Sequence, residues 1–241
     1  MFEFFVNIFD VFLYWPLFNC LVLIYNYLPG HDFGLAIICL TILIRFILYP
    51  LSVKALSSQK ALQRLQPQLK EIQEKYKSDK EKQAKETLEL YRKEKINPFS
   101  GLFLIILQFP ILIALYRVFW QGLKPEELKN LYAFVVNPMH INAMFLHTIN
   151  LSQPNLIFAV LAGILQFFQT KMLLPPTPKN PKDQADMSLV IQKQMIYFFP
   201  VITIVILYRL PAALGLYWIT SGIFSIIQQY FILKKAPVKN K

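Results

Sequence analysis

The chain has 241 residues, of which 55% are hydrophobic and only 16% are charged, and its mean hydropathy is +0.41. Soluble domains usually carry about 25% charged residues, so this composition excludes an ordinary soluble domain. The apolar runs are continuous rather than alternating over about ten residues, which excludes a transmembrane β-barrel. We therefore predict an all-α, polytopic membrane protein. The two cysteines, Cys20 and Cys39, lie in apolar stretches and predict neither a disulfide framework nor a metal site.

Residues 1–32 begin the chain with an apolar and aromatic segment that ends at a Pro-Gly pair. Up to Leu28 the segment contains two acidic residues but no Lys or Arg, unlike a secretory signal. Its aromatic residues are typical of the membrane interface: Tyr14, Trp15, Tyr25 and Tyr27. We expect this segment to form an interfacial helix that lies on the membrane, and a sixth membrane span is the alternative.

Residues 33–53 form the first predicted membrane span, because about 20 apolar residues are enough to cross a bilayer. Arg45 is the thirteenth of these 21 residues and the single charge among them. An Arg at such a depth costs about 2.5–3.5 kcal/mol on insertion scales, and its guanidinium does not lose its proton to avoid that cost. Arg45 must therefore either reach water along the helix surface or face a hydrated cavity within the membrane.

Residues 54–97 are highly charged, with 12 Lys or Arg and 7 acidic residues. Apolar residues recur at heptad spacing in the first half and more weakly in the second: Leu62, Leu65, Leu69, Ile72 and Tyr76, then Ala84, Leu88 and Tyr91. Between the halves, Ser78-Asp79 is typical of a turn followed by a helix cap. We predict a cytoplasmic antiparallel helical hairpin of coiled-coil type, bent at Pro67. It would be a docking arm for a partner or for lipid headgroups, and a solvated connector is the alternative.

Four more spans and their connections complete the predicted topology. In chain order they are the second span (98–120), an extracytoplasmic loop (121–154), the third span (155–174), a Pro-rich cytoplasmic loop (175–194), the fourth and fifth spans (195–233) and a basic cytoplasmic tail (234–241). The fourth span has about 16 residues before the turn at Arg209-Leu210-Pro211, or about 24 Å of helix. Because this is shorter than the roughly 30 Å of a hydrocarbon core, we expect local thinning of the bilayer.

The Lys and Arg residues are distributed unevenly over these connections. The hairpin, the Pro-rich loop with its flanking Lys residues, and the tail carry 20 of the 25, whereas the opposite side carries Arg117, Lys124, Lys129 and Arg209. The positive-inside rule assigns the richer side to the cytoplasm. Five spans, with the N-terminus outside and the C-terminus inside, satisfy this rule.

Polar residues within the predicted spans are candidates for the wall of a hydrated cavity around Arg45. They are Thr41, one turn away on the same helix, and Gln108, Gln166, Gln169, Tyr217, Thr220 and Ser221. The span interiors contain no Asp or Glu, so Arg45 lacks an obvious internal counter-ion and invites a transient anionic partner. For each polar residue the alternative is an interhelical hydrogen bond worth about 0.6 kcal/mol, and for Arg45 it is a purely structural, snorkelling side chain.

The sequence offers no catalytic site. It contains no His-Glu-x-x-His zinc motif, no Gly-x-Ser-x-Gly nucleophile motif, no P-loop and no pair of Asp residues within a span. We therefore predict neither an enzymatic activity nor a cofactor.

Five stretches follow one another along nearly the whole chain in an order that resembles a known family. They are Thr41-Ile-Leu-Ile-Arg45 with Tyr49-Pro50, the hairpin stretch from Leu65 to Tyr76, Asn97-Pro98 with Gln108-Phe-Pro110, Gln166 to Lys171, and Phe199-Pro200 with Leu214-Gly215-Leu-Tyr217-Trp218. Together they resemble the YidC/Oxa/Alb family of membrane protein insertases.

The resemblance implies an insertase and chaperone of membrane proteins, acting alone or beside the Sec translocon. In the family, five helices enclose a hydrophilic groove open to cytoplasm and lipid, and the Arg matching Arg45 attracts acidic regions of nascent membrane proteins. Gln169, Gln166 and Trp218 match groove-lining positions, and the hairpin is implicated in substrate capture. The implied partners are nascent membrane proteins, the Sec translocon, the ribosome with the signal recognition targeting machinery, and the lipid bilayer, without direct contact to nucleic acid. The implied location is the bacterial cytoplasmic (inner) membrane.

The chain also departs from parts of the family. It lacks the large extracytoplasmic domain and leading span of Gram-negative members and the clear lipoprotein cysteine of many Gram-positive ones, and its short basic tail argues against strong ribosome anchoring. A bacterial member with a minimal five-span core fits best, and an organellar member is the alternative. The competing functions are a small anion transporter or channel that uses Arg45, and a membrane-protein assembly scaffold without insertion activity.

Overall fold

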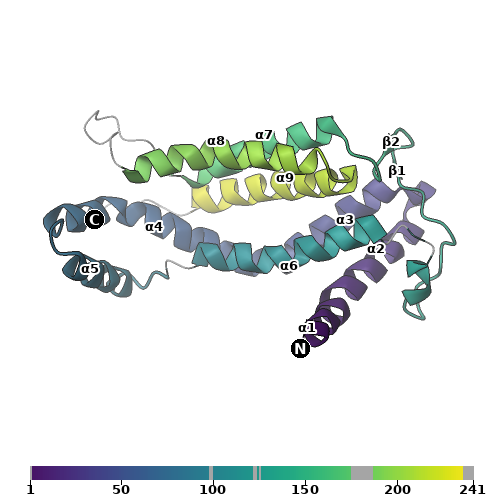
Figure 1. The fold of residues 1–241 in the computed structure, drawn as a ribbon, viewed down its shortest axis with the longest axis horizontal. Helices are drawn as coiled ribbons and strands as arrows, with labels where there is room; N and C mark the ends of the chain where they lie inside the picture. Colours follow the sequence, from purple (N-terminus) through teal and green to yellow (C-terminus); the bar gives the residue numbers. More distant parts are fainter. Residues whose placement is uncertain (1, 98–99, 122–123, 125, 175–186, 236–241) are drawn as a thin grey trace.

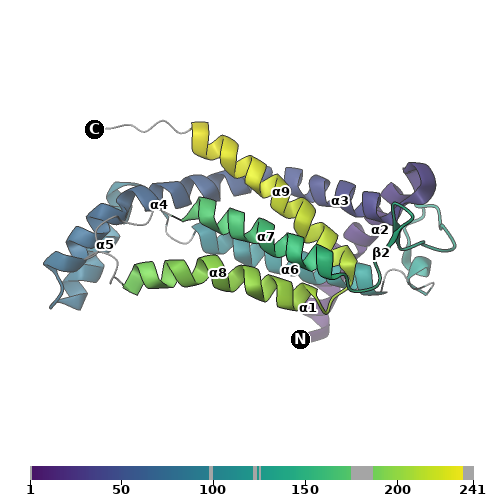
Figure 2. The same ribbon diagram turned by 90° about the horizontal axis from the view of Figure 1, so that it is seen from above.

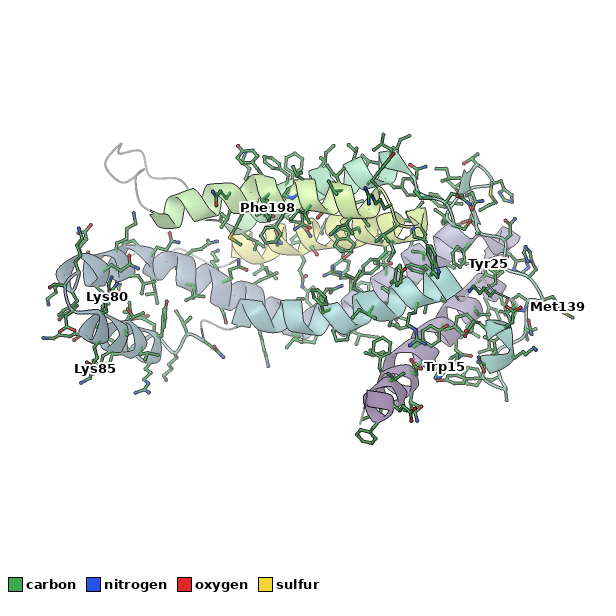
Figure 3. All side chains as sticks on the ribbon, in the orientation of Figure 1. Trp15, Tyr25, Lys80, Lys85, Met139 and Phe198 are labelled. Atoms are coloured by element: carbon green, nitrogen blue, oxygen red, sulfur yellow. The ribbon has the colours of Figure 1, made fainter. Side chains whose placement is uncertain are left out.

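A computed structural model describes residues 2–97, 100–121, 124, 126–174 and 187–235. The molecule is an elongated bundle of helices (Figure 1). A charged helical hairpin forms one end, and a loop with two short strands forms the other, in both views of the ribbon (Figures 1 and 2). Lys80 and Lys85 mark the hairpin end, whereas Trp15, Tyr25 and Met139 lie toward the opposite end (Figure 3). The predicted predominance of helix is confirmed.

The N-terminal segment is helical throughout and lies at the end opposite to the hairpin. It consists of α1 (Phe2–Phe9), a π-helical turn η1 (Asp10–Tyr14) and α2 (Trp15–Tyr27). Its side chains are hydrogen-bonded along its length to residues of the loop 121–154: Tyr14 to Glu127, Asn19 to Tyr132, Tyr25 to Asn142 and Asn26 to Val136. The stretch Val6–Tyr27 is long and apolar enough to cross a membrane, so length and composition alone leave both predicted placements open.

The first predicted span differs from the structure at its cytoplasmic end. Instead of one helix over residues 33–53, α3 (Phe33–Ile47) ends before Leu48 and α4 (Tyr49–Lys75) continues at an angle of 63°. The cause is Pro50, which lacks an N–H and whose ring would clash with the carbonyl of Phe46 in a continuous helix. The bend moves the last residues of the predicted span, from Tyr49 onward, into the helix of the hairpin.

The predicted hairpin is formed by α4 and α5 (Lys80–Lys93). The turn between them ends at Asp79, whose carboxylate accepts a hydrogen bond from the backbone N–H of Lys82 at 3.0 Å, so the predicted cap is confirmed. Helix α4 continues through Pro67 as one element. Leu65 of the predicted seam is buried, but Leu88 is 55% exposed and no residue of α5 is buried. The second half of the hairpin is therefore only loosely packed on the first.

Four further helices of at least 18 residues complete the bundle: α6 (Ser100–Gln121), α7 (Leu156–Leu173), α8 (Met187–Leu207) and α9 (Ala212–Lys235). Helix α7 begins within one residue of the predicted third span, capped by the side chain of Asn155. Helix α8 begins eight residues before the predicted start of the fourth span and has 21 residues. The helix therefore extends beyond the predicted span on its polar side, and its described apolar part, Gln194–Leu207, is short.

The loop between α6 and α7 contains structure that the sequence did not predict. A short 3₁₀ helix covers Glu127–Asn130, and strands β1 (Met144–Phe145) and β2 (Ile149–Asn150) pair antiparallel, with Met144 opposite Asn150 and Phe145 opposite Ile149. The prediction of an all-α fold therefore needs this one correction. This β-hairpin is small, since only two residues of each strand pair, and the fold remains predominantly helical.

The buried core is formed by the N-terminal segment, α3, α6, the loop 121–154 and the first turns of α7 and α9, whereas α8 packs mainly on α7. Close packing of α7 on α8 depends on Gly163, because a Cβ added there would lie 2.4 Å from the Cγ1 atom of Ile204. By length and composition, two described helical stretches can cross a membrane, Val6–Tyr27 and Leu156–Leu173, and the bent pair α3–α4 would be a third. The structure is thus that of a helical membrane protein.

Candidate functional site

Arg45 lies in the last turn of α3, just before the bend at Leu48. Its side chain is half-buried, and its Nη2 atom donates a hydrogen bond to the hydroxyl of Ser221 on α9. The end of a helix carries a partial negative charge from its unpaired carbonyl groups, which favours a cation at this position. The bend caused by Pro50 therefore gives Arg45 a position at a helix terminus rather than in the interior of a long span.

A second polar contact lies next to the first and involves Tyr217, one turn before Ser221 on α9. The Tyr217 hydroxyl accepts a hydrogen bond from Nε2 of Gln108 on α6. It also interacts with the Ser221 side chain and, electrostatically, with the Arg45 guanidinium. Both Tyr217 and Ser221 are buried, at 3% and 5% exposure. The four side chains thus connect three helices, α3, α6 and α9, in one polar cluster, which we call the Arg45 cluster (Arg45, Gln108, Tyr217 and Ser221).

The Arg45 cluster carries a positive charge that no carboxylate of the described residues balances. Within the described part of the chain, Arg45 forms no ion pair, and its hydrogen-bond partner is a neutral hydroxyl. Arg117 on α6 behaves differently, since it pairs with Asp10 of the N-terminal segment. A half-buried guanidinium without an opposite charge is costly in an apolar environment, and it is therefore suited to receive an anionic group.

Two of the remaining predicted site residues, Thr41 and Thr220, form hydrogen bonds within their own helices. Thr41 and Thr220 bond to the backbone of their own helices, at 2.6 Å to the Ile37 carbonyl and 2.9 Å to the Leu216 carbonyl, so neither hydroxyl links two helices. Thr41 is also fully buried. The hydrogen bonds of these two residues therefore indicate a local structural role.

Gln166 and Gln169 lie on α7, and Trp218 lies on α9 beside Tyr217 of the cluster. The Nε2 atom of Gln169 donates to the backbone carbonyl of Gly222 at 3.4 Å, so Gln169 links α7 to the helix that carries Ser221. Gln166 is half-buried. Trp218 is also half-buried, and its ring stands perpendicular to that of Tyr217 with 6.3 Å between the centroids. Of the two Gln residues, Gln169 is the one whose side chain bonds to α9 in the described structure.

Sequence reasoning missed a polar contact that continues the cluster toward the hairpin. Gln228 on α9 donates from Nε2 to the Ser52 hydroxyl on α4 at 2.6 Å, and both side chains are buried. The neighbouring Gln229 is buried as well, and no described group bonds to its Oε1. The signal was present in the sequence, because Tyr217, Ser221 and Gln228 are spaced by four and seven residues and so share one helix face.

Metal binding is not indicated by the described residues, among which no three His, Cys, Asp or Glu side chains are grouped closely enough to hold an ion. The arrangement can instead bind and orient an anionic or strongly polar segment through the guanidinium, hydroxyl and amide groups. Such groups lie close together at the meeting point of three helices, next to a bend.

Comparison with known proteins identifies the family. The family model described as "60Kd inner membrane protein" matches residues 23–240. The chain belongs to this family. It is 39% identical over 204 residues to the membrane protein insertase YidC of Fusobacterium nucleatum, a match that covers 85% of this chain and 87% of that protein. It is also 35% identical over 210 residues to the membrane protein insertase YidC of Francisella philomiragia, covering 87% of this chain.

The two relatives differ in size within the 60Kd inner membrane protein family. This chain matches nearly the whole Fusobacterium protein but only 34% of the length of the Francisella protein. The matched region of the family model contains all four residues of the Arg45 cluster, both helices of the hairpin and all the helices from α6 to α9. Membership in this family is thus consistent with the resemblance found in the sequence.

Proposed function

We propose that this protein is a membrane protein insertase and chaperone that accepts nascent membrane proteins and releases their apolar segments into the bilayer. The relatives from Fusobacterium and Francisella are membrane protein insertases by name, which supports insertion of membrane proteins as the activity. The single observation that carries the proposed mechanism is Arg45, a half-buried cation with a neutral partner, Ser221. The protein would act without a cofactor.

We further propose five membrane spans over residues 33–53, 98–120, 155–174, 195–210 and 211–233, with the N-terminus outside and the C-terminus inside. The N-terminal segment would then lie on the outer surface of the membrane. Its hydrogen bonds support this, because residues from Tyr14 to Asn26 bond to the extracytoplasmic loop 121–154 along the whole length of α2. A helix that crossed the bilayer would have only one end at the level of that loop.

In the proposed mechanism, the Arg45 cluster belongs to a hydrophilic groove that opens to the cytoplasm and to lipid, together with Thr41, Gln166, Gln169, Trp218 and Thr220. Water in the groove would hydrate the inner half of the membrane, so a short polar segment of the substrate would cross only the outer half without water. Arg45 would attract acidic residues of that segment and hold them near the bend. The charge favours such binding because, among the residues that the structure describes, no carboxylate pairs with it.

Release of the substrate would be driven by transfer of its apolar segment into lipid. Burial of apolar surface is worth about 25 cal/mol per Å², so a spanning helix supplies enough free energy without nucleotide hydrolysis. The proposed location is the bacterial cytoplasmic (inner) membrane. The Sec translocon, the ribosome and the signal recognition targeting machinery are proposed partners, and the exposed helix α5 of the hairpin is a suitable surface for recruitment.

Reconstitution of the purified protein in liposomes tests this function. A single-span substrate with a short acidic tail should acquire protease protection of its tail, and Arg45→Ala should lower the yield about ten-fold, equivalent to about 1.4 kcal/mol. Arg209→Ala is the matched control, because Arg209 is exposed in the turn between α8 and α9 and its loss should leave the yield unchanged. Anion flux through the liposomes without any insertion would contradict the proposal and support a transporter.

A further inference from the structure

A second cluster of charged and aromatic side chains lies outside the Arg45 cluster, where the N-terminal segment meets α6 and the loop that follows it. Arg117 on α6 forms an ion pair with Asp10 of η1, and its guanidinium lies over the ring of Tyr14, 4.4 Å from the ring centroid. The Tyr14 hydroxyl donates to the carboxylate of Glu127 at 3.1 Å. We call these four residues the Arg117 cluster (Asp10, Tyr14, Arg117 and Glu127).

The Arg117 cluster is largely shielded from solvent. Tyr14 is fully buried, and the side chains of Arg117 and Asp10 are 29% and 18% exposed. Removing one partner of a buried ion pair leaves an uncompensated charge, which costs far more than the loss of a pair on the surface. Arg117 and Asp10 therefore depend on each other, and their contact ties the N-terminal segment to α6.

The local helix geometry explains why one short stretch supplies two of these contacts. Asp10–Tyr14 form a π-helical turn, in which the N–H of Trp15 bonds to the carbonyl of Asp10, five residues earlier. Turns of this kind are rare, and they are frequent at functional sites. Asp10 and Tyr14 lie at the two ends of the turn, and both contact Arg117. A single turn thus presents a carboxylate and an aromatic ring to one guanidinium.

Helix α6 receives much of its support from this segment. Among the helices, α6 packs mainly on α4 and on the N-terminal segment, and less extensively on α9. Helix α4 belongs to the hairpin end of the molecule, whereas the N-terminal segment lies toward the opposite end (Figure 1). The N-terminal segment is therefore the main helical support of α6 at the end away from the hairpin.

The same helix carries Gln108, which donates to the Tyr217 hydroxyl in the Arg45 cluster. Arg117 follows Gln108 by nine residues, about two and a half turns at 3.6 residues per turn, so the two side chains leave α6 on opposite sides. Helix α6 is thus fixed to the N-terminal segment on one side and contributes to the Arg45 cluster on the other. Rotation or displacement of α6 would separate Gln108 from Tyr217.

We propose that Asp10 and Tyr14 are positioning residues, which through the Arg117 cluster hold α6 at the place where Gln108 reaches Tyr217. Both lie outside the residues that the family model matches, whereas their two partners in the cluster lie inside them. The N-terminal segment is in this way a support, within the chain itself, for one wall of the proposed groove. The inference rests on the proposed function for its effect on insertion, and its structural part is tested without a substrate.

The structural test measures the distance between α6 and α9 by double electron–electron resonance in the full-length protein in liposomes. Spin labels are attached through Ile113→Cys on α6 and Ile223→Cys on α9, two exposed positions, after the natural cysteines are replaced by Ala. Asp10→Asn should broaden the distance distribution and shift it, because α6 loses its fixed contact with the N-terminal segment. Glu3→Gln is the matched control, since it removes an exposed carboxylate from the same segment and should leave the distribution unchanged.

A second variant and a second pair of labels complete the structural test. The double variant Asp10→Asn/Arg117→Gln leaves neither charge of the pair unpaired, so it should remain folded and still show the broadened distribution. Labels on α7 and α9, at the exposed Ile157 and Ile223, should keep their distance in every variant, because α6 is not part of that pair of helices. An unchanged distance between α6 and α9 in the folded double variant would overturn the proposal.

Insertion in liposomes distinguishes positioning from a direct role of the Arg117 charge. Asp10→Asn and Arg117→Gln should each lower the insertion of an acidic-tailed and of a Lys-tailed substrate by the same factor, about five-fold, equivalent to about 1 kcal/mol. The factor is the same because the charge of Arg45 is kept. A loss confined to the acidic tail in Arg117→Gln would make Arg117 a receiving charge and would overturn the proposal. If the natural protein inserted neither substrate, the proposed function would fail, and the distance between α6 and α9 would decide the positioning role by itself.

Discussion

Arg45 on α3 donates its hydrogen bond to Ser221 on α9, a residue 176 positions later in the chain. The contact joins the end of the first long helix of the bundle to the middle of the last one, next to the bond between Gln108 and Tyr217. It holds the guanidinium in place without neutralising it. The position of the guanidinium therefore depends on Ser221, whereas the charge belongs to Arg45 itself, so the two can be tested separately.

Replacement of Ser221 by Ala should loosen the position of Arg45 while keeping its charge. We expect a loss of stability of about 1 kcal/mol, within the range of interhelical hydrogen bonds in membranes, and a smaller loss of insertion of acidic substrates than with Arg45→Ala. Thermal unfolding in detergent and insertion yield in liposomes measure the two effects. Thr220→Ala is the control, because the Thr220 hydroxyl donates to the Leu216 carbonyl of its own helix.

If Ser221→Ala abolished insertion as completely as Arg45→Ala while the protein remained folded, the hydroxyl itself would be the receiving group. That outcome would contradict a role for Ser221 in positioning alone.

Close packing of α7 on α8 should depend on the absence of a side chain at Gly163. A Cβ there would lie 2.4 Å from Cγ1 of Ile204 and 3.1 Å from the carbonyl oxygen of Pro200. We expect Gly163→Ala to lower the unfolding free energy by about 1–3 kcal/mol, as overpacking does in well-packed cores. Ile204→Ala in the same chain should restore part of the loss, and unchanged stability of Gly163→Ala would show that the helices are further apart.

Asp32 should stabilise the fold more than an ordinary helix cap, because its buried carboxylate bonds to two backbone groups. It accepts from the N–H of Leu35 at 2.9 Å, which caps α3, and from the N–H of Leu146 at 2.6 Å. Leu146 has a φ of +48°, a conformation that side chains disfavour. We expect Asp32→Ala to cost about 2 kcal/mol of unfolding free energy.

Asn155→Ala is the comparison for this effect, since Asn155 caps α7 through a single bond to the N–H of Phe158 at 3.2 Å. Its loss should cost about 1 kcal/mol. Equal losses in the two variants, measured by denaturation of the same preparation in detergent, would mean that the bond from Asp32 to Leu146 contributes no stability.

Helices with long apolar runs could be predicted from sequence because the signal is local. Helix α7 and the turn before α9 lie close to their predicted places, and the cap at Asp79 forms as expected. The break at Leu48 was missed because apolar character continues through Pro50, whereas the helix ends on steric grounds. The start of α8 was missed for the opposite reason, since polar residues precede its apolar part but remain helical.

The partners within the site could be predicted less well than the residues themselves. Arg45, Gln108, Tyr217 and Ser221 were all candidates, yet nothing local indicates that Arg45 bonds to Ser221 while Gln108 bonds to Tyr217. Such pairings depend on how α3, α6 and α9 are placed in space. Gln228 was overlooked because it lies near the end of a span, although its spacing from Ser221 puts the two residues on one face of α9.

The central claim is that the charge of Arg45 attracts acidic residues of the substrate, and a charge exchange tests it most directly. Insertion yield in liposomes is measured for the natural protein and for Arg45→Glu, each with a substrate whose tail is acidic and with the same substrate carrying Lys in place of the acids. We predict that the natural protein favours the acidic tail and that Arg45→Glu favours the basic tail. If Arg45→Glu remained folded and kept the original preference, attraction by Arg45 would be contradicted.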